Sequence, residues 1–282
     1  MKSYILSCDI GTTSLTGMLI SFQDTEKPQV LVSYQESLKI SFPQISWVEQ
    51  ELESIWQACL KVIRTLVEKA QERQPNFQPS DIAALSLTNQ RESLCVWERE
   101  SGKALYPLIS WQCKRSTAIC ERLKKAGLEE ELHKKTGLFL DPYFTGSKLS
   151  WLFEHEKDLK KLILNKKALI GTVDSFIIYK LSGGKAFVTD PTNASRTLFY
   201  ELEKRKFSAD LLELVCGEKN LELARICDSS GLFAKTKNIS PLLDGTEIRA
   251  CLGDQQAALV GHRCLSPKSA KCTFGTGAFY LQ

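Results

Sequence analysis

The stretch at residues 9–14, with the sequence DIGTTS, constrains the possible fold more than any other part of the chain. It lies between two apolar-rich runs, Tyr4–Cys8 and Leu15–Phe22, which predicts two consecutive strands joined by a tight hairpin. Gly11 permits such a turn because it has no Cβ. An ordinary polar turn is the alternative interpretation of these residues. The functional interpretation is an anion site, with a metal ion nearby, for which the candidates are Asp9 for the metal and Thr12, Thr13 and Ser14 for the anion.

A similar turn occurs near the other end of the chain, at residues 273–278, with the sequence TFGTGA. It again combines glycines with hydroxyl-bearing residues. Two such turns at opposite ends of the sequence predict two surfaces that close on one polyphosphate. The candidate residues of this second turn are Gly275, Thr276 and Gly277.

Composition and charge exclude several classes of protein. The length of 282 residues allows one large or two smaller domains, and the net charge of +4 does not indicate nucleic acid or an anionic membrane as a partner. No apolar run approaches membrane-spanning length, and no signal-peptide pattern is visible. The ten cysteines form no CxxC pair, so we expect free thiols in a reducing, cytoplasmic setting. Alternating strand and helix patterns predict an α/β fold.

A polar cluster follows a short apolar run at Ile82–Leu87, which has the pattern of a buried, parallel strand. Ligands of open α/β sheets bind beyond the carboxyl ends of such strands. Arg91 and Glu92 fall there, and together they offer fixed N–H donors beside carboxylate acceptors, which suits a small polyol. A surface ion pair of little energetic value is the alternative.

A second candidate cluster, Gly253–Gln256, follows the predicted strand Glu247–Leu252. Asp254 is placed to act as a general base, with the Gln255 carboxamide beside it. The alternative is that Asp254 only caps the helix that follows. Two aromatic residues, Trp111 and Tyr143, can wall a ligand pocket, although isolated aromatic residues more often belong to the core.

Taken together, these motifs resemble one family, the FGGY carbohydrate kinases of the actin-like ATPase superfamily, and within it most closely the members that phosphorylate glycerol. The resemblance covers essentially the whole chain, and its specificity comes from the joint occurrence of the motifs in this order. They are residues 9–14, 47–50 (WVEQ), 89–92 (NQRE), 111–112 (WQ), 140–144 (LDPYF), 189–196 (TDPTNASR), 253–258 (GDQQAA) and 274–277 (FGTG).

The resemblance implies an actin-like (ribonuclease-H-like) α/β domain, with a mixed sheet flanked by helices, followed by the beginning of a second such domain. It places the first domain at residues 1–256 and the start of the second, nucleotide-binding domain at residues 257–282. Family members continue well beyond this length, so we expect an incomplete form whose last hairpin, Ala270–Gln282, exposes apolar surface. A homo-oligomer is compatible with the family.

The resemblance also implies ATP-dependent transfer of a phosphoryl group to glycerol, with Mg²⁺ held near Asp9 through water and Asp254 as the base. The alternatives are a family member that acts on another polyol or sugar, and a non-catalytic polyol-binding or partner-binding product. The implied glycerol-binding residues are Arg91, Glu92, Trp111, Tyr143, Asp254, Gln255 and Phe279, and the implied phosphate-binding residues are Thr12, Thr13, Ser14, Gly275, Thr276 and Gly277.

Overall fold

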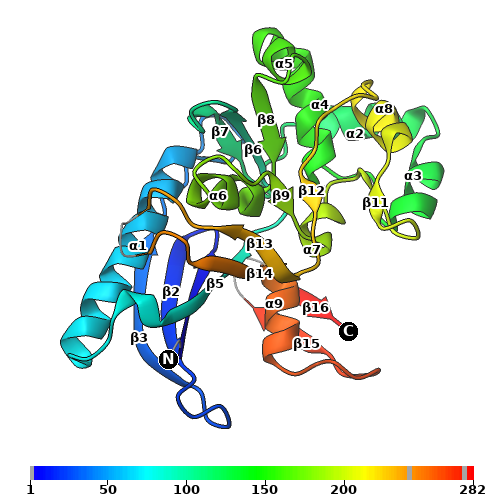
Figure 1. The fold of residues 1–282 in the computed structure, drawn as a ribbon. Helices are drawn as coiled ribbons and strands as arrows, with labels where there is room; N and C mark the ends of the chain where they lie inside the picture. Colours follow the sequence, from blue (N-terminus) through cyan, green and yellow to red (C-terminus); the bar gives the residue numbers. More distant parts are fainter. Residues whose placement is uncertain (1–2, 240–242, 275–277) are drawn as a thin grey trace.

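The computed structural model describes residues 3–239, 243–274 and 278–282 (Figure 1). Its centre is a mixed sheet in the order β13-β14-β5-β1-β2-β3. β1, β5 and β14 run parallel, whereas β2, β3 and β13 are antiparallel to their neighbours. These strands are β1 (Tyr4–Ile10), β2 (Ser14–Ser21), β3 (Gln29–Ser37), β5 (Ile82–Asn89), β13 (Ser230–Lys235) and β14 (Glu247–Gly253). The predicted first hairpin and the mixed α/β fold are therefore confirmed.

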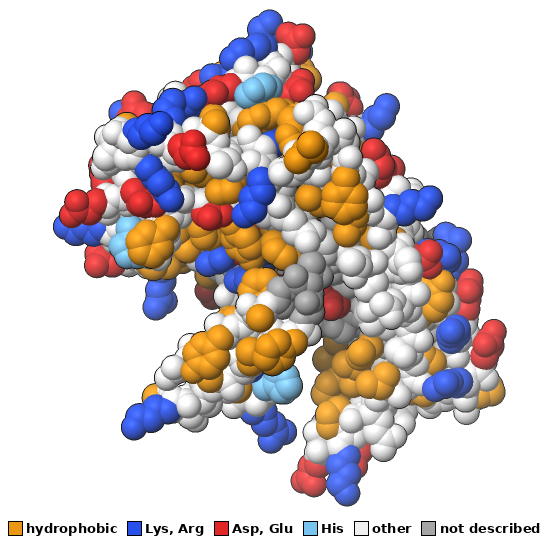
Figure 2. All heavy atoms as spheres, turned by 180° about the vertical axis from the view of Figure 1, so that it is seen from behind, with side chains coloured by type: hydrophobic (Ala, Val, Ile, Leu, Met, Phe, Trp, Pro, Cys, Tyr) orange, Lys and Arg blue, Asp and Glu red, His pale blue; other side chains and the backbone are white. Residues whose placement is uncertain are grey.

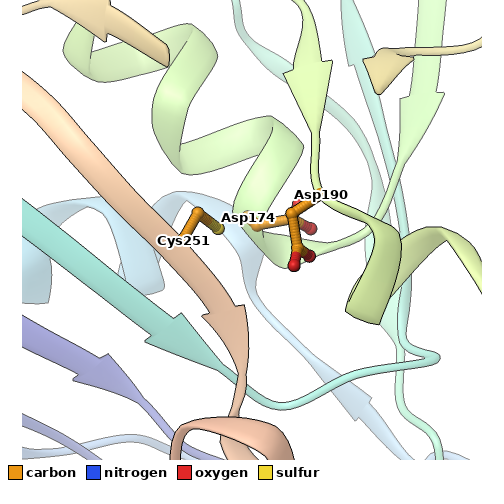
Figure 3. Close-up of side chains that lie close together, drawn as sticks. All are labelled: Asp174, Asp190 and Cys251. Atoms are coloured by element: carbon orange, nitrogen blue, oxygen red, sulfur yellow. The ribbon is translucent and has the colours of Figure 1, made fainter. Parts of the chain in front are cut away.

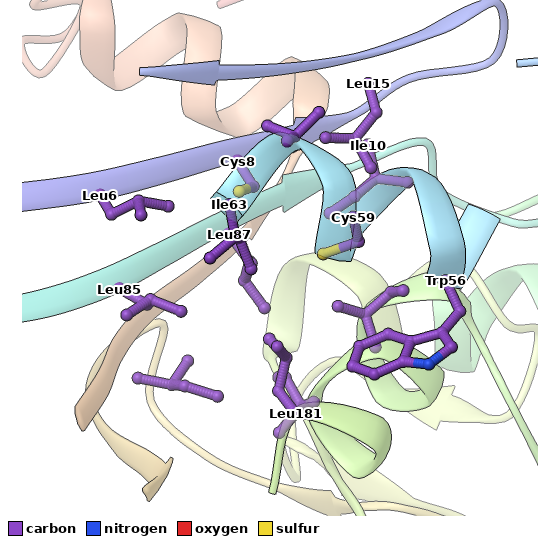
Figure 4. Packing of buried hydrophobic residues seen from close by; sticks show 14 of the residues in the cluster. Leu6, Cys8, Ile10, Leu15, Trp56, Cys59, Ile63, Leu85, Leu87 and Leu181 are labelled. Carbon is purple, nitrogen blue, oxygen red and sulfur yellow. The ribbon is translucent and has the colours of Figure 1, made fainter. Parts of the chain in front are cut away.

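Two helices cover one face of this sheet, α1 (Leu52–Arg73) and α6 (Val173–Leu181). The apolar positions of α1 recur every three or four residues, and the helix buries that face. Figure 4 shows its Cys59 and Ile63 packed with side chains of β1 and β5 and with Leu181 of α6. Alternate residues of β1 point into this core, so the strand buries one face and leaves Asp9 on the other.

A second, antiparallel sheet in the order β4-β7-β6-β8 lies beside the first. Its strands are β4 (Glu49–Gln50), β6 (Leu94–Glu98), β7 (Ala104–Ile109) and β8 (Ala168–Gly171). A separate hydrophobic core joins it to the surrounding helices, of which α4 buries nearly its whole surface. These helices are α2 (Thr117–Lys125), α3 (Glu129–Thr136), α4 (Thr145–His155), α5 (Lys157–Leu164) and α8 (Ala209–Cys216).

The remaining elements are short. α7 (Pro191–Ala194) and α9 (Asp254–Gly261) both contact β14, and a 3₁₀ turn occupies Pro79–Asp81. The small ladders are β9 (Val188–Thr189) with β12 (Arg225–Ile226), β10 (Tyr200–Glu201) with β11 (Lys206–Phe207), and β15 (Lys271–Phe274) with β16 (Ala278–Leu281).

The β15–β16 hairpin and α9 extend from the body of the molecule, and Figure 2 shows hydrophobic side chains gathered on this segment at the lower left. Phe274 is 83% and Tyr280 68% exposed, which confirms the expected apolar surface on the last hairpin. All ten cysteines are free, as predicted, and six of them are buried. No helix in the described part of the chain combines the length and apolarity needed to cross a membrane.

Candidate active site

The three parallel strands of the large sheet end at one common edge. Ile10 of β1 pairs with Asn89 of β5, and Asn89 pairs on its other side with Gly253 of β14. The DIGTTS turn, the polar cluster after β5 and the GDQQ segment after β14 therefore begin at the same level of the sheet. The carboxyl edge is where the sequence argument places a ligand.

A cavity of about 170 Å³ opens at this edge. It brings together all seven residues that the family resemblance assigns to the polyol, together with two residues of the first hairpin. The lining residues are Thr12, Thr13, Gln90, Arg91, Glu92, Trp111, Tyr143, Asp254, Gln255, Thr273 and Phe279. The volume accommodates several water molecules or one small polyol.

Arg91 and Glu92 are buried, so the interpretation of a surface ion pair is wrong. Arg91 is 6% exposed and Glu92 is 1% exposed. The Glu92 carboxylate accepts a hydrogen bond of 2.6 Å from Nε of Arg196, and Arg91 lies 3.8 Å away. Burial raises the pKa of Glu92, while the charges of Arg91 and Arg196 oppose that shift. The two arginines therefore compensate a carboxylate that the fold has removed from water.

Glu92 also adopts a left-handed backbone conformation, with φ of 59°. This conformation is uncommon for a residue other than glycine, and it is maintained only where the surrounding contacts require it. Here the ion pair with Arg196 holds the side chain, and the Glu92 carbonyl accepts a hydrogen bond from the Thr145 hydroxyl. The strained residue lies at the cavity wall.

One buried donor of Arg91, its Nε, makes an ion pair with Asp254 but no hydrogen bond with the described residues. This Nε lies 3.3 Å from Oδ1 of Asp254. The other end of the guanidinium donates to Gln256. A buried N–H without a hydrogen bond is costly, and the nearby Asp254 carboxylate offsets part of that cost. Arg91 and Asp254 both line the cavity, so their ion pair is a polar feature that a ligand with hydroxyl groups can contact.

Asp254 is the first residue of α9, and Gly253 is its N-cap. The alternative that Asp254 only caps the helix is therefore wrong. Its side chain is 38% exposed toward the cavity edge, and its Oδ1 accepts the backbone N–H of Gln255. The carboxamide of Gln255 is held in turn by the Lys271 ammonium group. A partly exposed carboxylate beside the Arg91 guanidinium can both bind a hydroxyl and accept its proton.

Aromatic rings form another side of the cavity. The ring of Trp111 lies 5.5 Å from that of Tyr143 and 6.1 Å from that of Phe279. Nε1 of Trp111 donates to the Thr12 hydroxyl at 2.9 Å, which connects this wall to the first hairpin. Burial raises the pKa of Tyr143 to about 12, so the phenol is a proton donor at neutral pH.

The first hairpin is held through its backbone carbonyls. The carbonyls of Gly11 and Thr12 accept hydrogen bonds from Gln90 and Gln50, and that of Thr13 accepts from the N–H of Leu38. A Cβ on Gly11 would lie 3.0 Å from the Ser14 carbonyl oxygen, so the turn has little room for a side chain. Ser14 begins β2 and does not line the cavity.

Asp9 lies near the same edge. Although part of its side chain is exposed, desolvation by the surrounding protein and, second, the charge of Asp254 raise its pKa to about 6. Two carboxylates that repel each other across a site fit a cation between them. The second turn, with Gly275, Thr276 and Gly277, lies outside the described residues.

Several residues of the site have no individual role in the sequence analysis. Arg196 pairs with Glu92, and Lys148, which is fully buried, donates to the carbonyls of Pro142, Tyr143 and Phe144. Burial lowers the pKa of Lys148 to about 7. For Lys148 the local sequence offers little signal, since Ser147 precedes it and Leu149 follows it, whereas Arg196 belongs to the TDPTNASR motif.

Comparison with known proteins agrees with this geometry. Residues 4–261 match the N-terminal domain of the FGGY family of carbohydrate kinases. The chain is 40% identical over 283 residues to a glycerol kinase of Rhizobium meliloti and 38% identical over 281 residues to one of Bacillus cytotoxicus. All of this chain is covered in both alignments, but only 54% and 55% of those relatives. The chain thus spans about half the length of the curated relatives it matches.

Solved structures show the same relationship. The crystal structure of Plasmodium falciparum glycerol kinase with ADP matches 98% of this chain and 53% of its own, with a TM-score of 0.92 and 26% identity. A ligand-bound xylulose kinase of Lactobacillus acidophilus matches with a TM-score of 0.83 at 22% identity, which supports the fold alone. The family match, the full-length alignments and the arrangement of the cavity agree, and the chain belongs to the FGGY family of carbohydrate kinases.

Proposed function

We propose that this chain carries the substrate-binding and proton-accepting part of an enzyme that phosphorylates glycerol with ATP. The observation that carries the proposal is the cavity at the carboxyl edge of the large sheet, where the ion-paired Arg91 guanidinium and Asp254 carboxylate line the same small volume. Glycerol has hydroxyls that donate and accept, and a carbon chain that packs against aromatic rings. The identity of about 40% to glycerol kinases supports glycerol over a larger sugar.

In the proposed reaction, Arg91 and Glu92 bind two hydroxyls of glycerol, while Trp111 and Phe279 pack against its carbon atoms. Asp254 accepts the proton of the remaining hydroxyl as that oxygen forms a bond to the γ-phosphorus of ATP. The bond between this phosphorus and the β–γ bridging oxygen breaks, and ADP leaves. Such a base contributes about 10²–10⁴ in rate, and positioning of the two substrates contributes much of the rest.

We propose that the first hairpin binds the phosphates through Thr12, Thr13 and Ser14, whereas Gly275, Thr276 and Gly277 belong to the proposed second phosphate turn. Asp9 fits as the residue that holds a hydrated Mg²⁺, because desolvation and, second, the charge of Asp254 disfavour its ionised form, and a nearby cation would favour it. When bound, Mg²⁺ neutralises phosphate charge. The proposed division between the two family domains falls after residue 256, within α9.

The proposal is tested by calorimetric titration of the 282-residue chain with glycerol and then with Mg·ATP, followed by an assay for ADP release. We expect glycerol to bind, and xylitol and xylulose to bind more weakly. Glycerol binding without turnover would assign the substrate site to this chain and the remaining machinery to sequence beyond it. Failure to bind glycerol, or tighter binding of the five-carbon ligands, would contradict the proposal.

Asp254→Asn is the decisive variant for the role of the base. In a form that turns over, we expect the rate of transfer to fall by about 10²–10⁴ while glycerol binding largely survives. Asp210→Asn, which changes an exposed carboxylate on α8, is the matched control and should leave both unchanged. Loss of binding with intact turnover in Asp254→Asn would remove Asp254 from this role.

A further inference from the structure

Beyond the cavity, the fold buries another carboxylate that makes an unusual number of hydrogen bonds. Asp190 is 0% exposed and is the N-cap of α7. It accepts the backbone N–H groups of Thr192 and Asn193 at 3.1 and 2.9 Å, and the side-chain amide of Asn193 at 2.9 Å. It also accepts the hydroxyls of Thr192 and Ser229, both at 2.7 Å. These five bonds fix a helix of only four residues in one orientation.

Figure 3 shows that Asp190 lies beside two further polar groups, Asp174 and Cys251, whose side-chain atoms lie within 4.8 Å of one another. Three such side chains can hold a metal ion, but hydrogen bonds and a neutral Asp174 account for their proximity without one. The Asp174 oxygens accept the hydroxyls of Thr172 and Thr189, and burial raises the pKa of Asp174 to about 7, which favours its neutral form. Burial also raises the pKa of Cys251. Asp190 is thus held as a hydrogen-bond acceptor in a dry environment.

The helix that Asp190 fixes is tied to two of the three parallel strands that end at the cavity, β5 and β14. The Thr192 hydroxyl oxygen accepts the backbone N–H of Gly253 at 2.7 Å, directly before Asp254. The amides of Asn193 and Asn89 exchange two hydrogen bonds, of 2.9 and 3.2 Å. Asn89 is the last residue of β5, two residues before Arg91 in the chain.

The connection matters for the site because the backbone at Gly253 and the side chain of Arg91 lie very close together. The chain at Gly253 approaches Arg91 so closely that a Cβ there would lie 2.3 Å from Cδ of Arg91. The distance between the base and the guanidinium therefore depends on how the last residues of β5 and β14 are held. A misplacement of about 1 Å can lower the rate of an enzyme about 10²-fold.

We infer that Asp190, Thr192 and Asn193 are positioning residues, which hold the ends of β5 and β14 together and thereby set Asp254 at its distance from Arg91. None of the three lines the cavity, so they act through other residues. The inference rests on the proposed function for its effect on glycerol, but the tether itself is independent of any ligand.

Thr192→Val tests the tether, because valine has nearly the same shape and no hydroxyl. We expect amide hydrogen exchange at Gly253 to speed up at least tenfold, and the dissociation constant for glycerol to rise about 5- to 50-fold. Thr192→Ser keeps the hydroxyl and should restore both values to near those of the original chain. Ser195→Ala is the matched control, since among the described residues this hydroxyl in the same segment bonds only to the Thr192 carbonyl.

Amide exchange at Gly253 and affinity for glycerol together support or overturn the inference. Unchanged Gly253 exchange and unchanged glycerol affinity in Thr192→Val would overturn the inference, as would an equal loss of affinity in Ser195→Ala. If the original chain does not bind glycerol, the proposed function fails, and Gly253 exchange in Thr192→Val still tests the tether. In a form that turns over, KM for glycerol should rise as kcat falls, whereas a general loss of stability would lower the apparent kcat and leave KM unchanged.

Discussion

The close approach between Gly253 and Arg91 leads to a sharp prediction for Gly253→Ala. The backbone at this position, with φ of −61° and ψ of 147°, is open to any residue, so alanine introduces no backbone strain. Its Cβ would lie 2.3 Å from Cδ and 2.6 Å from Cγ of Arg91, against an ordinary contact of about 3.4–4 Å. The side chain of Arg91 must therefore move by about 1 Å or more.

This movement has two measurable costs. Overpacking of a buried group costs about 1–3 kcal/mol in the free energy of unfolding. A displaced guanidinium also loses its hydrogen bond to a glycerol hydroxyl, and a bond to a charged group contributes about 1.5–3 kcal/mol. We therefore expect the dissociation constant for glycerol to rise about 10- to 100-fold, measured by calorimetry, with urea unfolding for the stability.

Gly261→Ala is the matched control. Gly261 belongs to the same helix, and a Cβ there meets no atom within 4 Å. Replacing a helical glycine with alanine should raise the free energy of unfolding by about 0.5–1 kcal/mol and leave glycerol binding unchanged. If Gly253→Ala binds glycerol as tightly as the original chain, Arg91 has room to adjust. The close approach of Gly253 then does not fix the position of the Arg91 guanidinium to within about 1 Å, and the reasoning is refuted.

Three further predictions concern the buried charges and the sheet. Asp174 has its pKa raised by burial and by Asp190 to about 7, so it stabilises the fold fully below about pH 4 and that contribution is lost as the pH rises through 7. In Asp174→Asn, urea unfolding should show a flatter pH dependence between pH 4 and 8, with a difference of at most about 4 kcal/mol, and an unchanged slope would contradict this. Glu92→Gln should lower the free energy of unfolding by about 2–3 kcal/mol, because it leaves the Arg196 guanidinium uncompensated, and a double-mutant cycle with Arg196→Gln should be less than additive. Gly17→Ala should lower the melting temperature, because its Cβ would lie 2.3 Å from a side-chain carbon of α1, and overpacking costs about 1–3 kcal/mol; an unchanged melting temperature would show that α1 can shift.

The fold and the place of the site follow from local patterns. An apolar-rich run predicts β1, and apolar residues at spacings of three and four predict α1. Parallel strands have their carboxyl ends at one edge, so residues 11, 90 and 254 must lie near one another once their strands are recognised. The shared edge of the parallel strands therefore predicts that the polar residues after β1, β5 and β14 meet, whereas Phe279 follows only from the family resemblance.

The contacts that support the site could not be predicted in this way. The bonds between Glu92 and Arg196 and between Asn89 and Asn193 each join residues 104 positions apart. In the sequence, residues 189–193 are simply dense in turn formers, because a short helix capped by aspartate and a plain turn use the same residue types. The partner of a capping residue depends on the tertiary fold.

The supporting contacts surround buried charged groups, because a charge that is removed from water needs partners within the protein. The charge on Glu92 is compensated by Arg196 and Arg91, and the ammonium of Lys148 is satisfied by the carbonyls of the loop that carries Tyr143. Burying such groups stabilises a fold little, but each one fixes the direction of its neighbours. At the cavity, Nε of Arg91 lies 3.3 Å from Oδ1 of Asp254, and both residues line the volume proposed for glycerol. Because the surrounding buried groups hold Glu92 and the Tyr143 loop in place, the polar groups that a polyol would contact are positioned before the ligand binds.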